Sequence, residues 1–268
     1  CDFIHEAYRK ANLTPEDIDT GAIIVTGEAA KKKNAEAIAA LFSAEAGKFV
    51  CATAGHNLEA ILASYGSGAV HMTYHEGGDF TVMNVDIGGG TSKIAIVQGG
   101  KVIDTCAVEV GARLVAMDEN GVINRLEDTA LKFAKMSGID GLKLGGTMGE
   151  DDKEKFAKAL CDALFEVMER GPLSPQVQDL LLTPNLDFKD PIHAVMFSGG
   201  VSEFVYGYEK RNLGDLGAQF GKRVRARANQ LGGGNIPLRP ADVRIRATVI
   251  GASQYTVQVS GNTIYLSH

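Results

Sequence analysis

An acid followed by three glycines is the part of this sequence with the clearest chemical potential. Asp86-Ile87-Gly88-Gly89-Gly90-Thr91 lies between two apolar runs, Phe80–Val85 and Lys93–Val97, and is typical of a strand, a turn and a second strand. Glycine in a strand pair costs about 0.5–1 kcal/mol relative to alanine, so something must need the bare backbone there. We predict that the backbone N–H groups of this turn hold a phosphate, and that Asp86 organises a metal ion or a water molecule.

Two other segments carry candidate residues. Glu59 falls in an expected helix, Leu58–Tyr65, where it could be an ordinary solvated side chain. Ser198-Gly199-Gly200-Val201 follows an apolar strand and could be a plain connection from a strand to a helix. A family resemblance, given below, implies instead that Glu59 orients or weakly activates an attacking water and that the glycines let the backbone lie against a ribose and a base.

The elements that must position these residues alternate between strands and helices. Three strands in meander order, Phe80–Ile87, Lys93–Gln98 and Lys101–Val110, are joined in part by a Gly99-Gly100 turn and followed later by a parallel-type strand, Ile192–Phe197. This order indicates a layered α/β fold and not a Rossmann order. The other expected strands are Gly21–Glu28 with its turn, Phe49–Ala54 and Val243–Val249; the other expected helices are Phe3–Ala11, one capped by Thr14 and starting at Pro15, Asn34–Ala46, Asn124–Met136, Asp151–Glu169, Asp215–Gln230 and Gly251–Val259.

Composition excludes several classes of protein. The 268 residues carry a net charge of −6, which argues against binding nucleic acid through bulk charge. No apolar run reaches the roughly 20 residues that span a membrane, and no secretory signal opens the chain. Four widely spaced cysteines are expected to be reduced cytosolic thiols, mostly buried: Cys1, Cys51, Cys106 and Cys161.

Several conspicuous runs are expected to have structural or surface roles. Lys31-Lys32-Lys33 is interpreted as a solvated helix start, and Lys222–Arg227 as a solvated face, with docking to an acidic partner as the alternative. The histidines show no metal-ligand spacing in this interpretation: His5, His56, His71, His75, His193 and His268.

Four segments, in order and spacing, resemble the actin-like ATPases, the superfamily that includes sugar kinases and heat-shock chaperones. Asp86–Thr91 resembles the second phosphate loop and Met196–Ser202 the adenosine-binding loop; Leu58–Gly68 and Val249–Ser253 resemble the two connections between domains. The resemblance implies ATP and Mg²⁺ as ligands, Glu59 and Asp86 as catalytic residues, and Asp86 as the holder of Mg²⁺ through water. The nucleotide-binding residues that it implies are Gly88, Gly89, Gly90, Thr91, Ser198, Gly199, Gly200, Val201 and Gly251.

The resemblance also implies a fold: a ribonuclease H-like, actin-like α/β fold with mixed sheets flanked by helices and two domains around a nucleotide cleft. Residues 1–79 would be the remainder of the first domain, with a C-terminal helix at 251–268 packing back on it, and residues 80–250 would form the second. An Asp-x-Gly-Thr-Thr hairpin, the superfamily's first phosphate loop, is absent from these residues, and the chain starts at Cys1. We therefore expect a fragment with an incomplete first domain, which binds nucleotide weakly and does not hydrolyse it efficiently.

Three stretches are more closely similar to the ethanolamine ammonia-lyase reactivating factors: Gly21–Glu28, Arg246–Ala252 and Ser260–Leu266. That similarity implies an ATP-dependent, chaperone-like partner of an adenosylcobalamin enzyme, which frees ethanolamine ammonia-lyase of damaged cobalamin. It also implies a cytoplasmic protein associated with a bacterial microcompartment, with no nucleic-acid or membrane partner and an unknown oligomeric state. The alternatives are a small-molecule kinase of the same superfamily, for which no separate acid motif stands out, and an actin-like filament protein.

Overall fold

The computed structural model describes residues 2–17, 21–25 and 49–254 of the chain. Two compact units form: one from residues 1–55 and 252–268, the other from residues 56–251. Residues 56–79 therefore fall in the same unit as the main sheet, while the domain boundary expected near residue 79 stays a prediction. Of the earlier expectations, Lys31–Lys33 and the helix Asn34–Ala46 lie outside the described residues.

The described part of the first unit contains one pair of strands and two short helical elements. β1 (Gly21–Val25) pairs in parallel with β2 (Phe49–Thr53), which confirms both predicted strands. Helix α1 (Asp2–Lys10) confirms the predicted N-terminal helix. The short helix η1 (Pro15–Asp17) starts at Pro15, as expected. The Asp17 carboxylate accepts a hydrogen bond from the N–H of Thr14, the residue before the helix, at 2.8 Å.

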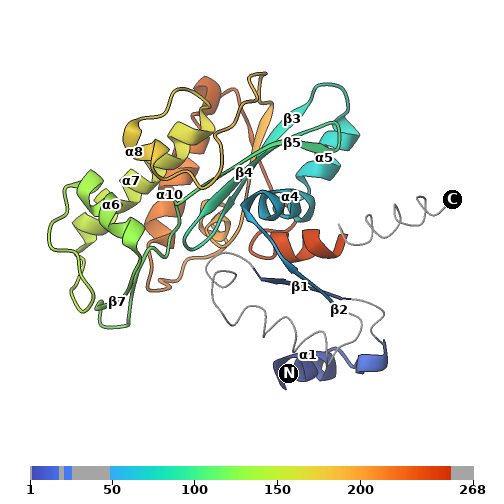
Figure 1. Ribbon diagram of the computed structural model, residues 1–268, viewed down its shortest axis with the longest axis horizontal. Helices are drawn as coiled ribbons and strands as arrows, with labels where there is room; N and C mark the ends of the chain where they lie inside the picture. Colours follow the sequence, from blue (N-terminus) through green and yellow to red (C-terminus); the bar gives the residue numbers. More distant parts are fainter. Residues whose placement is uncertain (1, 18–20, 26–48, 255–268) are drawn as a thin grey trace. The chain divides into compact units, whose positions relative to one another are not determined.

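A five-stranded mixed sheet forms the centre of the second unit (Figure 1). β3 (Thr81–Ile87), β4 (Ser92–Gln98) and β5 (Lys101–Val108) make the predicted antiparallel meander. β8 (Ala194–Ser198) and β9 (Leu238–Arg239) extend it in parallel beyond β3, giving the order β5-β4-β3-β8-β9. The predicted mixed α/β class, and not a Rossmann order, is thereby confirmed.

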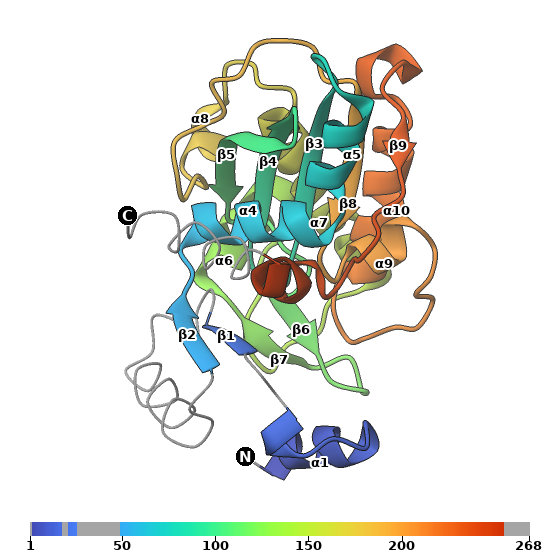
Figure 2. The ribbon, with the colours of Figure 1, turned by 90° about the vertical axis from the view of Figure 1, so that its right-hand side faces the viewer.

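Helices cover both faces of this sheet, as Figures 1 and 2 show together. α4 (His56–Gly66) and α5 (Ala69–Glu76) lie on one face. The other face carries α6 (Asp128–Ser137), α7 (Glu150–Met168) and α10 (Gly217–Ala228). The shorter elements of this unit are β6 (Val115–Met117), β7 (Ile123–Leu126), α8 (Pro175–Gln178), α9 (Ser202–Val205) and η2 (Leu231–Gly234).

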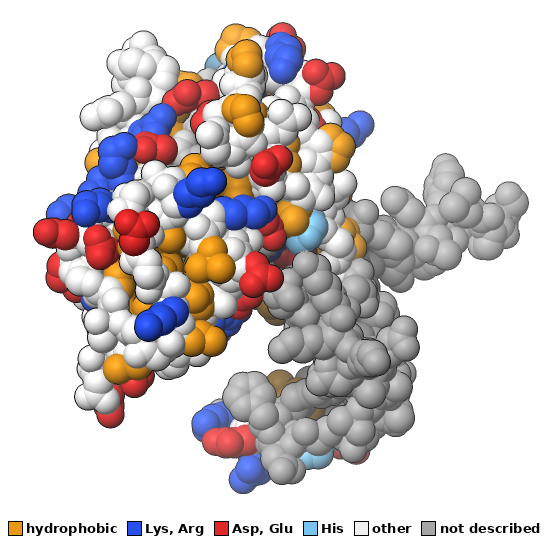
Figure 3. Space-filling view, turned by 60° about the vertical axis from the view of Figure 1, so that its left-hand side comes forward, with side chains coloured by type: hydrophobic (Ala, Val, Ile, Leu, Met, Phe, Trp, Pro, Cys, Tyr) orange, Lys and Arg blue, Asp and Glu red, His pale blue; other side chains and the backbone are white. Residues whose placement is uncertain are grey.

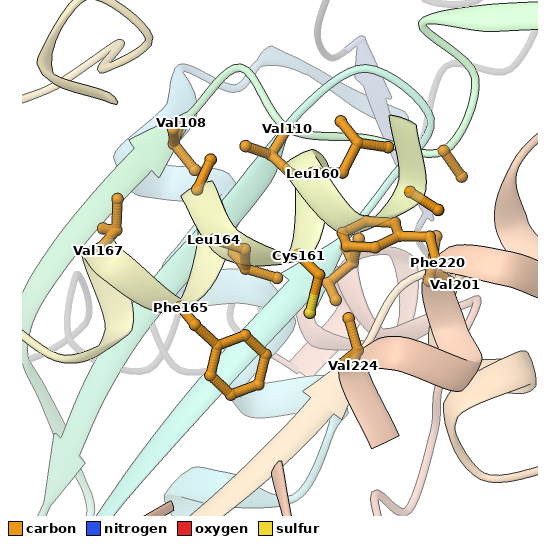
Figure 4. Close-up of a cluster of buried hydrophobic side chains, with 14 of the residues drawn as sticks. Val108, Val110, Leu160, Cys161, Leu164, Phe165, Val167, Val201, Phe220 and Val224 are labelled. Carbon is orange, nitrogen blue, oxygen red and sulfur yellow. The ribbon is translucent and has the colours of Figure 1, made fainter. Parts of the chain in front are cut away.

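The larger hydrophobic core lies between the sheet and α7 (Figure 4). Leu160, Leu164 and Phe165 of α7 are fully buried beside side chains of β5 and α10. Cys161 and Cys106 are buried free cysteines, and burial raises the pKa of each thiol to about 11. For these two residues the prediction of buried, unpaired thiols is confirmed.

The basic run in α10 is used mainly within the unit. Arg223 pairs with Glu154 at 2.6 Å, and Arg227 pairs with Asp162 at 2.8 Å while lying 4.8 Å from the centre of the Phe165 ring. Figure 3 shows basic and acidic side chains interspersed over the described part of the face in view. These pairs join α10 to α7 across the surface of the core, and such half-exposed pairs contribute about 0–1 kcal/mol each. No helix among the described residues is both long and apolar enough to cross a membrane.

Two predictions about secondary structure are wrong, and one helix, α5, was not predicted. Val243–Val249 is not a strand: its backbone turns and enters a helix at residue 247, whose described part extends to residue 254. Two of its apolar side chains do not face a core, since Ile245 is 64% exposed and Val249 63% exposed. The predicted helix Asn124–Met136 begins instead as strand β7, and the helix α6 starts only at Asp128.

Close backbone packing explains why residues 247–254 form a helix. A Cβ atom at Gly66 would overlap the carbonyl oxygen of Ala247, and one at Gly251 would overlap the carbonyl oxygen of Leu62. The two helices therefore cross at glycines, with no side chain between their backbones, and this crossing holds α4 in place beside the sheet. Predicted nucleotide-binding residue Gly251 thus has a packing role in the structure.

We predict that Gly66→Ala destabilises the protein by about 1–3 kcal/mol, because the added methyl group must push two backbones apart. The measurement is the free energy of unfolding in urea. Gly171→Ala is the matched control: nothing lies within 4 Å of its added Cβ and its φ is not left-handed. The control should change stability by less than about 0.5 kcal/mol, and equal losses in the two variants would contradict the packing role.

Candidate functional site

Strand alternation brings four polar side chains to the face of the sheet that α4 covers. In β3, Met83, Val85 and Ile87 join the large core, so Asn84 and Asp86 point to the opposite face. The register pairs Asp86 with Lys93 of β4 on one side and with Ser198 of β8 on the other. Glu59, on α4, completes the group.

These side chains form one buried polar network, here called the Asp86 cluster: Glu59, Asn84, Asp86, Lys93 and Ser198. Lys93 Nζ lies 2.5 Å from Glu59 Oε2, and both side chains are under 10% exposed. The Ser198 hydroxyl donates to Asp86 Oδ1 at 2.8 Å, and Asn84 Nδ2 donates to the Ser198 oxygen at 3.3 Å. Among the described residues, nothing donates to the buried Asn84 Oδ1.

Burial is the main influence on Asp86, whose side chain has little contact with solvent. Desolvation raises the pKa of Asp86 above its ordinary value; the positive charge of Lys93 and the hydrogen bond from Ser198 oppose the rise, and the negative charge of Glu59 adds to it. With both carboxylates ionised, the cluster would hold two negative charges and one positive charge, and burial opposes that state at Asp86.

Hydrogen bonds fix part of the glycine turn after Asp86, whereas other N–H groups of the turn have no acceptor among the described residues. Gly88 donates to the Thr91 carbonyl at 3.0 Å, and the Gly89 carbonyl accepts from Arg113 N–H at 2.6 Å. None of Gly88, Gly89 and Gly90 has a left-handed φ, and nothing lies within 4 Å of a Cβ placed on Gly90. Among the described residues, the N–H groups of Gly89, Gly90 and Thr91 have no hydrogen-bond acceptor. Neither backbone conformation nor packing therefore requires glycine at position 90.

The turn after β8 contains one glycine that the fold requires and one that it does not. Gly199 has a φ of 82°, and its Cβ would overlap the backbone of Ile87, so only glycine fits this crossing of two strand ends. Gly200 has nothing within 4 Å of an added Cβ, and its N–H has no partner among the described residues. Val201 donates to the Ile87 carbonyl at 3.2 Å, which fixes this turn against the end of β3.

Most of the site residues predicted from sequence are therefore neighbours. The turn from Gly88 to Thr91 and the turn from Ser198 to Val201 leave adjacent strands, and Glu59 joins them through Lys93. Gly251 does not belong to this group of turns, because it packs on α4. Ser198 itself is fully buried beneath the turn and contacts Asp86.

Two basic residues of the site were not predicted from the sequence. Lys93 begins the predicted apolar strand Lys93–Gln98, and a lysine inside such a strand is itself a signal of a buried ion pair. Arg113 lies beside the glycine turn: a side chain added at Gly89 would meet it at 3.4–3.7 Å. Its guanidinium is half-exposed and 3.8 Å from the Asp215 carboxylate, which holds a positive charge beside the turn.

We predict that Lys93→Met destabilises the protein by about 3–5 kcal/mol, because it leaves two buried carboxylates without their cation. Adding Glu59→Gln to this variant should recover part of the loss. Urea unfolding of both variants gives the comparison, with Lys158→Met as control for an exposed pair, Lys158–Asp162, worth less than about 1 kcal/mol. A loss at Lys93 no larger than that at Lys158 would contradict the buried pairing.

A second prediction concerns pH. Since burial raises its pKa, Asp86 contributes stability that is fully present below its unfolded pKa and lost as the pH rises through its folded pKa. Asp86→Asn keeps an acceptor for Ser198 but cannot ionise, so its stability relative to the natural chain should increase from about pH 4 upward. Thermal unfolding between pH 4 and about 8 measures the difference; a variant that loses stability relative to the natural chain as pH rises would contradict the direction.

Comparison with known proteins shows similarity both in sequence and in structure. The chain is 35% identical over 266 residues to the ethanolamine ammonia-lyase reactivase EutA of Salmonella typhimurium, covering 97% of this chain and 54% of that protein. It is 34% identical over 271 residues to the ethanolamine ammonia-lyase reactivase EutA of Escherichia coli, covering 98% of this chain and 55% of that protein. The chain therefore spans about half the length of these relatives.

Solved structures of low sequence identity also align with it. One is the activator of the 2-hydroxyisocaproyl-CoA dehydratase from Clostridium difficile with bound ADPNP, at a TM-score of 0.46 and 13% identity, over 99% of this chain and 83% of that one. Another is the PPX-GPPA enzyme of Aquifex aeolicus, at a TM-score of 0.49 and 13% identity, over 92% and 78%. The family model for ethanolamine utilisation protein EutA matches residues 1–268. The chain therefore belongs to the EutA family of ethanolamine utilisation proteins.

Proposed function

We propose that the two glycine turns and the Asp86 cluster bind ATP in an actin-like ATPase that reactivates ethanolamine ammonia-lyase. The observation that carries this proposal is the pair of open glycines, Gly90 and Gly200, at the ends of neighbouring strands. Each has an N–H group without a partner among the described residues and empty space where a side chain would be. Bare backbone amides with room in front of them are the usual donors to a phosphate group.

The first turn suits the charged end of the nucleotide. Three N–H groups, those of Gly89, Gly90 and Thr91, have no acceptor among the described residues, and the aliphatic part of the positively charged Arg113 side chain lies beside Gly89. Hydrogen bonds between such groups and phosphate oxygens are charge-assisted and are about twice as strong as neutral ones. We assign this turn to the β- and γ-phosphates, and Gly200 and Val201 to the ribose and base.

The donor set also fits Mg²⁺ bound mainly by water. Asp86 lies next to the last residue of β3, directly before the turn, and no group of three metal-binding side chains forms among the described residues. Mg²⁺ dehydrates reluctantly and is usually held by one or two carboxylates together with phosphate oxygens. We assign Asp86 to holding the hydrated ion, which when bound would neutralise charge on the phosphates.

Glu59 is assigned to orienting the attacking water. Its carboxylate pairs with Lys93 inside the cluster, which fixes its position. We assign to it the role of accepting a hydrogen bond from a water molecule and holding that water in place. Such a site would hydrolyse ATP slowly, which suits a protein whose nucleotide state controls binding to a partner.

The names of the relatives support a partner. Both curated relatives are reactivases of ethanolamine ammonia-lyase, so we propose this lyase as the partner. On the family resemblance of the sequence we further propose release of damaged cobalamin as the outcome, and a cytoplasmic location in association with a bacterial microcompartment. The net charge of −6 disfavours a nucleic-acid partner.

We predict that Gly90→Val and Gly200→Val each weaken ATP binding about tenfold or more, the equivalent of about 1.4 kcal/mol, because the new side chains fill the space in front of the amides. The measurement is the dissociation constant of a fluorescent ATP analogue, obtained by titrating a protein that contains this chain. Gly171→Val is the matched control, since position 171 is equally open but far along the chain from both turns. Unchanged binding in the first two variants would refute the assignment of the turns.

Reactivation of the lyase is tested separately. Inactivated ethanolamine ammonia-lyase should regain activity when ATP, fresh adenosylcobalamin and the protein are supplied together, and Gly90→Val should reduce the rate of recovery. Transfer of phosphate to a small metabolite in excess of transfer to water would show a kinase instead.

A further inference from the structure

Two histidines on α5 face each other on the surface of the second unit. His71 and His75 are separated by four residues, so they lie on the same side of the helix, one turn apart. Their Nε2 atoms are 2.9 Å apart, and the ring centres are 4.2 Å apart with an angle of 59° between the planes. Both side chains are exposed, so an ion from solvent can reach them.

We propose that His71 and His75 chelate a late first-row divalent metal ion, Ni²⁺ or Cu²⁺. Imidazole nitrogen is a preferred ligand of both ions, and the affinity of such ligands rises along the series towards copper. In the absence of metal the two rings share one hydrogen bond. For both Nε2 atoms to bind the ion, the shared proton moves through solvent to Nδ1 of the same ring, and both exposed rings turn about χ2 so that the two Nε2 lone pairs face the ion.

The two nitrogens are close enough to share one ion. With metal–nitrogen bonds of about 2.0–2.1 Å, two ligands at a right angle lie about 2.9 Å apart, and two ligands at the tetrahedral angle lie about 3.3 Å apart. The hydrogen-bonded rings already place their nitrogens 2.9 Å apart, so only the direction of the rings has to change for a right-angled site. Right-angled sites, square-planar or octahedral, are those that Ni²⁺ and Cu²⁺ favour, whereas structural Zn²⁺ sites are tetrahedral.

The end of the helix adds a favourable field. His75 lies in the last turn of α5, where the backbone carbonyl groups carry a partial negative charge that favours a cation. Tyr74 packs against the His75 ring edge-on at 5.5 Å, and α5 is anchored where the Thr73 hydroxyl accepts from the Gly100 N–H at 3.1 Å. Among the described residues no third His, Cys, Asp or Glu joins the pair, so the remaining coordination positions belong to water.

The experiment is a titration of tag-free protein with Ni²⁺ by calorimetry, together with hydrogen exchange of the α5 amides. The natural chain should bind one Ni²⁺ at this site at least tenfold more tightly than His71→Ala or His75→Ala, because each variant loses the chelate. Nickel should also slow exchange within residues 69–76 in the natural chain only. Alanine is a good helix former, so both variants retain α5.

A matched control keeps the number of histidines and changes only their spacing. Combining His75→Ala with Glu76→His moves the second imidazole to five residues from His71, on another side of the helix. This variant should bind Ni²⁺ as weakly as His75→Ala. Equal affinity in the natural chain and in either the single variant or the moved pair would overturn the proposal, as would unchanged exchange in α5 on adding Ni²⁺.

Discussion

One buried ammonium group makes the polar end of the sheet possible. Two carboxylates are buried here, Glu59 on α4 and Asp86 on the strand that α4 covers, and isolated buried carboxylates cost several kcal/mol each. Lys93 lies between them in register with Asp86 and in contact with Glu59, which lowers that cost without removing it. The raised pKa of Asp86 reflects the part that remains. A cation supplied from outside, such as Mg²⁺ with a phosphate, would complete the balance.

The position of α4 depends on small residues on both of its sides. Glu59 reaches Lys93 because α4 lies close to the sheet, where the smaller core contains small residues such as Ala60 of α4 itself, Ala69 of α5 and Ala95 of β4. On its other side, Gly66 and Gly251 let the helix at residues 247–254 approach backbone to backbone. The ion pair and this helix crossing therefore support the same arrangement, one through charge and the other through the absence of side chains.

The sequence was sufficient for the sheet and for most of the site, because both depend on local patterns. Alternation and glycine turns predicted β3, β4, β5 and β8, and the same turns carried the candidate phosphate-binding residues. Contacts between distant residues could not be predicted from these local patterns. The helix that starts at residue 247 packs on α4, and Lys93 pairs with Glu59, which is 34 positions away in the sequence. His71 and His75 were interpreted as lacking metal-ligand spacing because α5 has little amphipathic pattern, so no helix was predicted to bring the two rings together.

The glycines around Asp86 divide into two groups with different causes. Gly199 and Gly111 are required by the fold, since any side chain there would overlap the backbone of a neighbouring segment. Gly90 and Gly200 are not: alanine would fit both their conformation and their surroundings, and would reduce the entropy lost on folding. Keeping glycine at these two positions costs stability, as does ionising the buried Asp86 beside them. Stability lost at three neighbouring positions, without any gain in packing, indicates a surface shaped for a ligand and not for the fold alone.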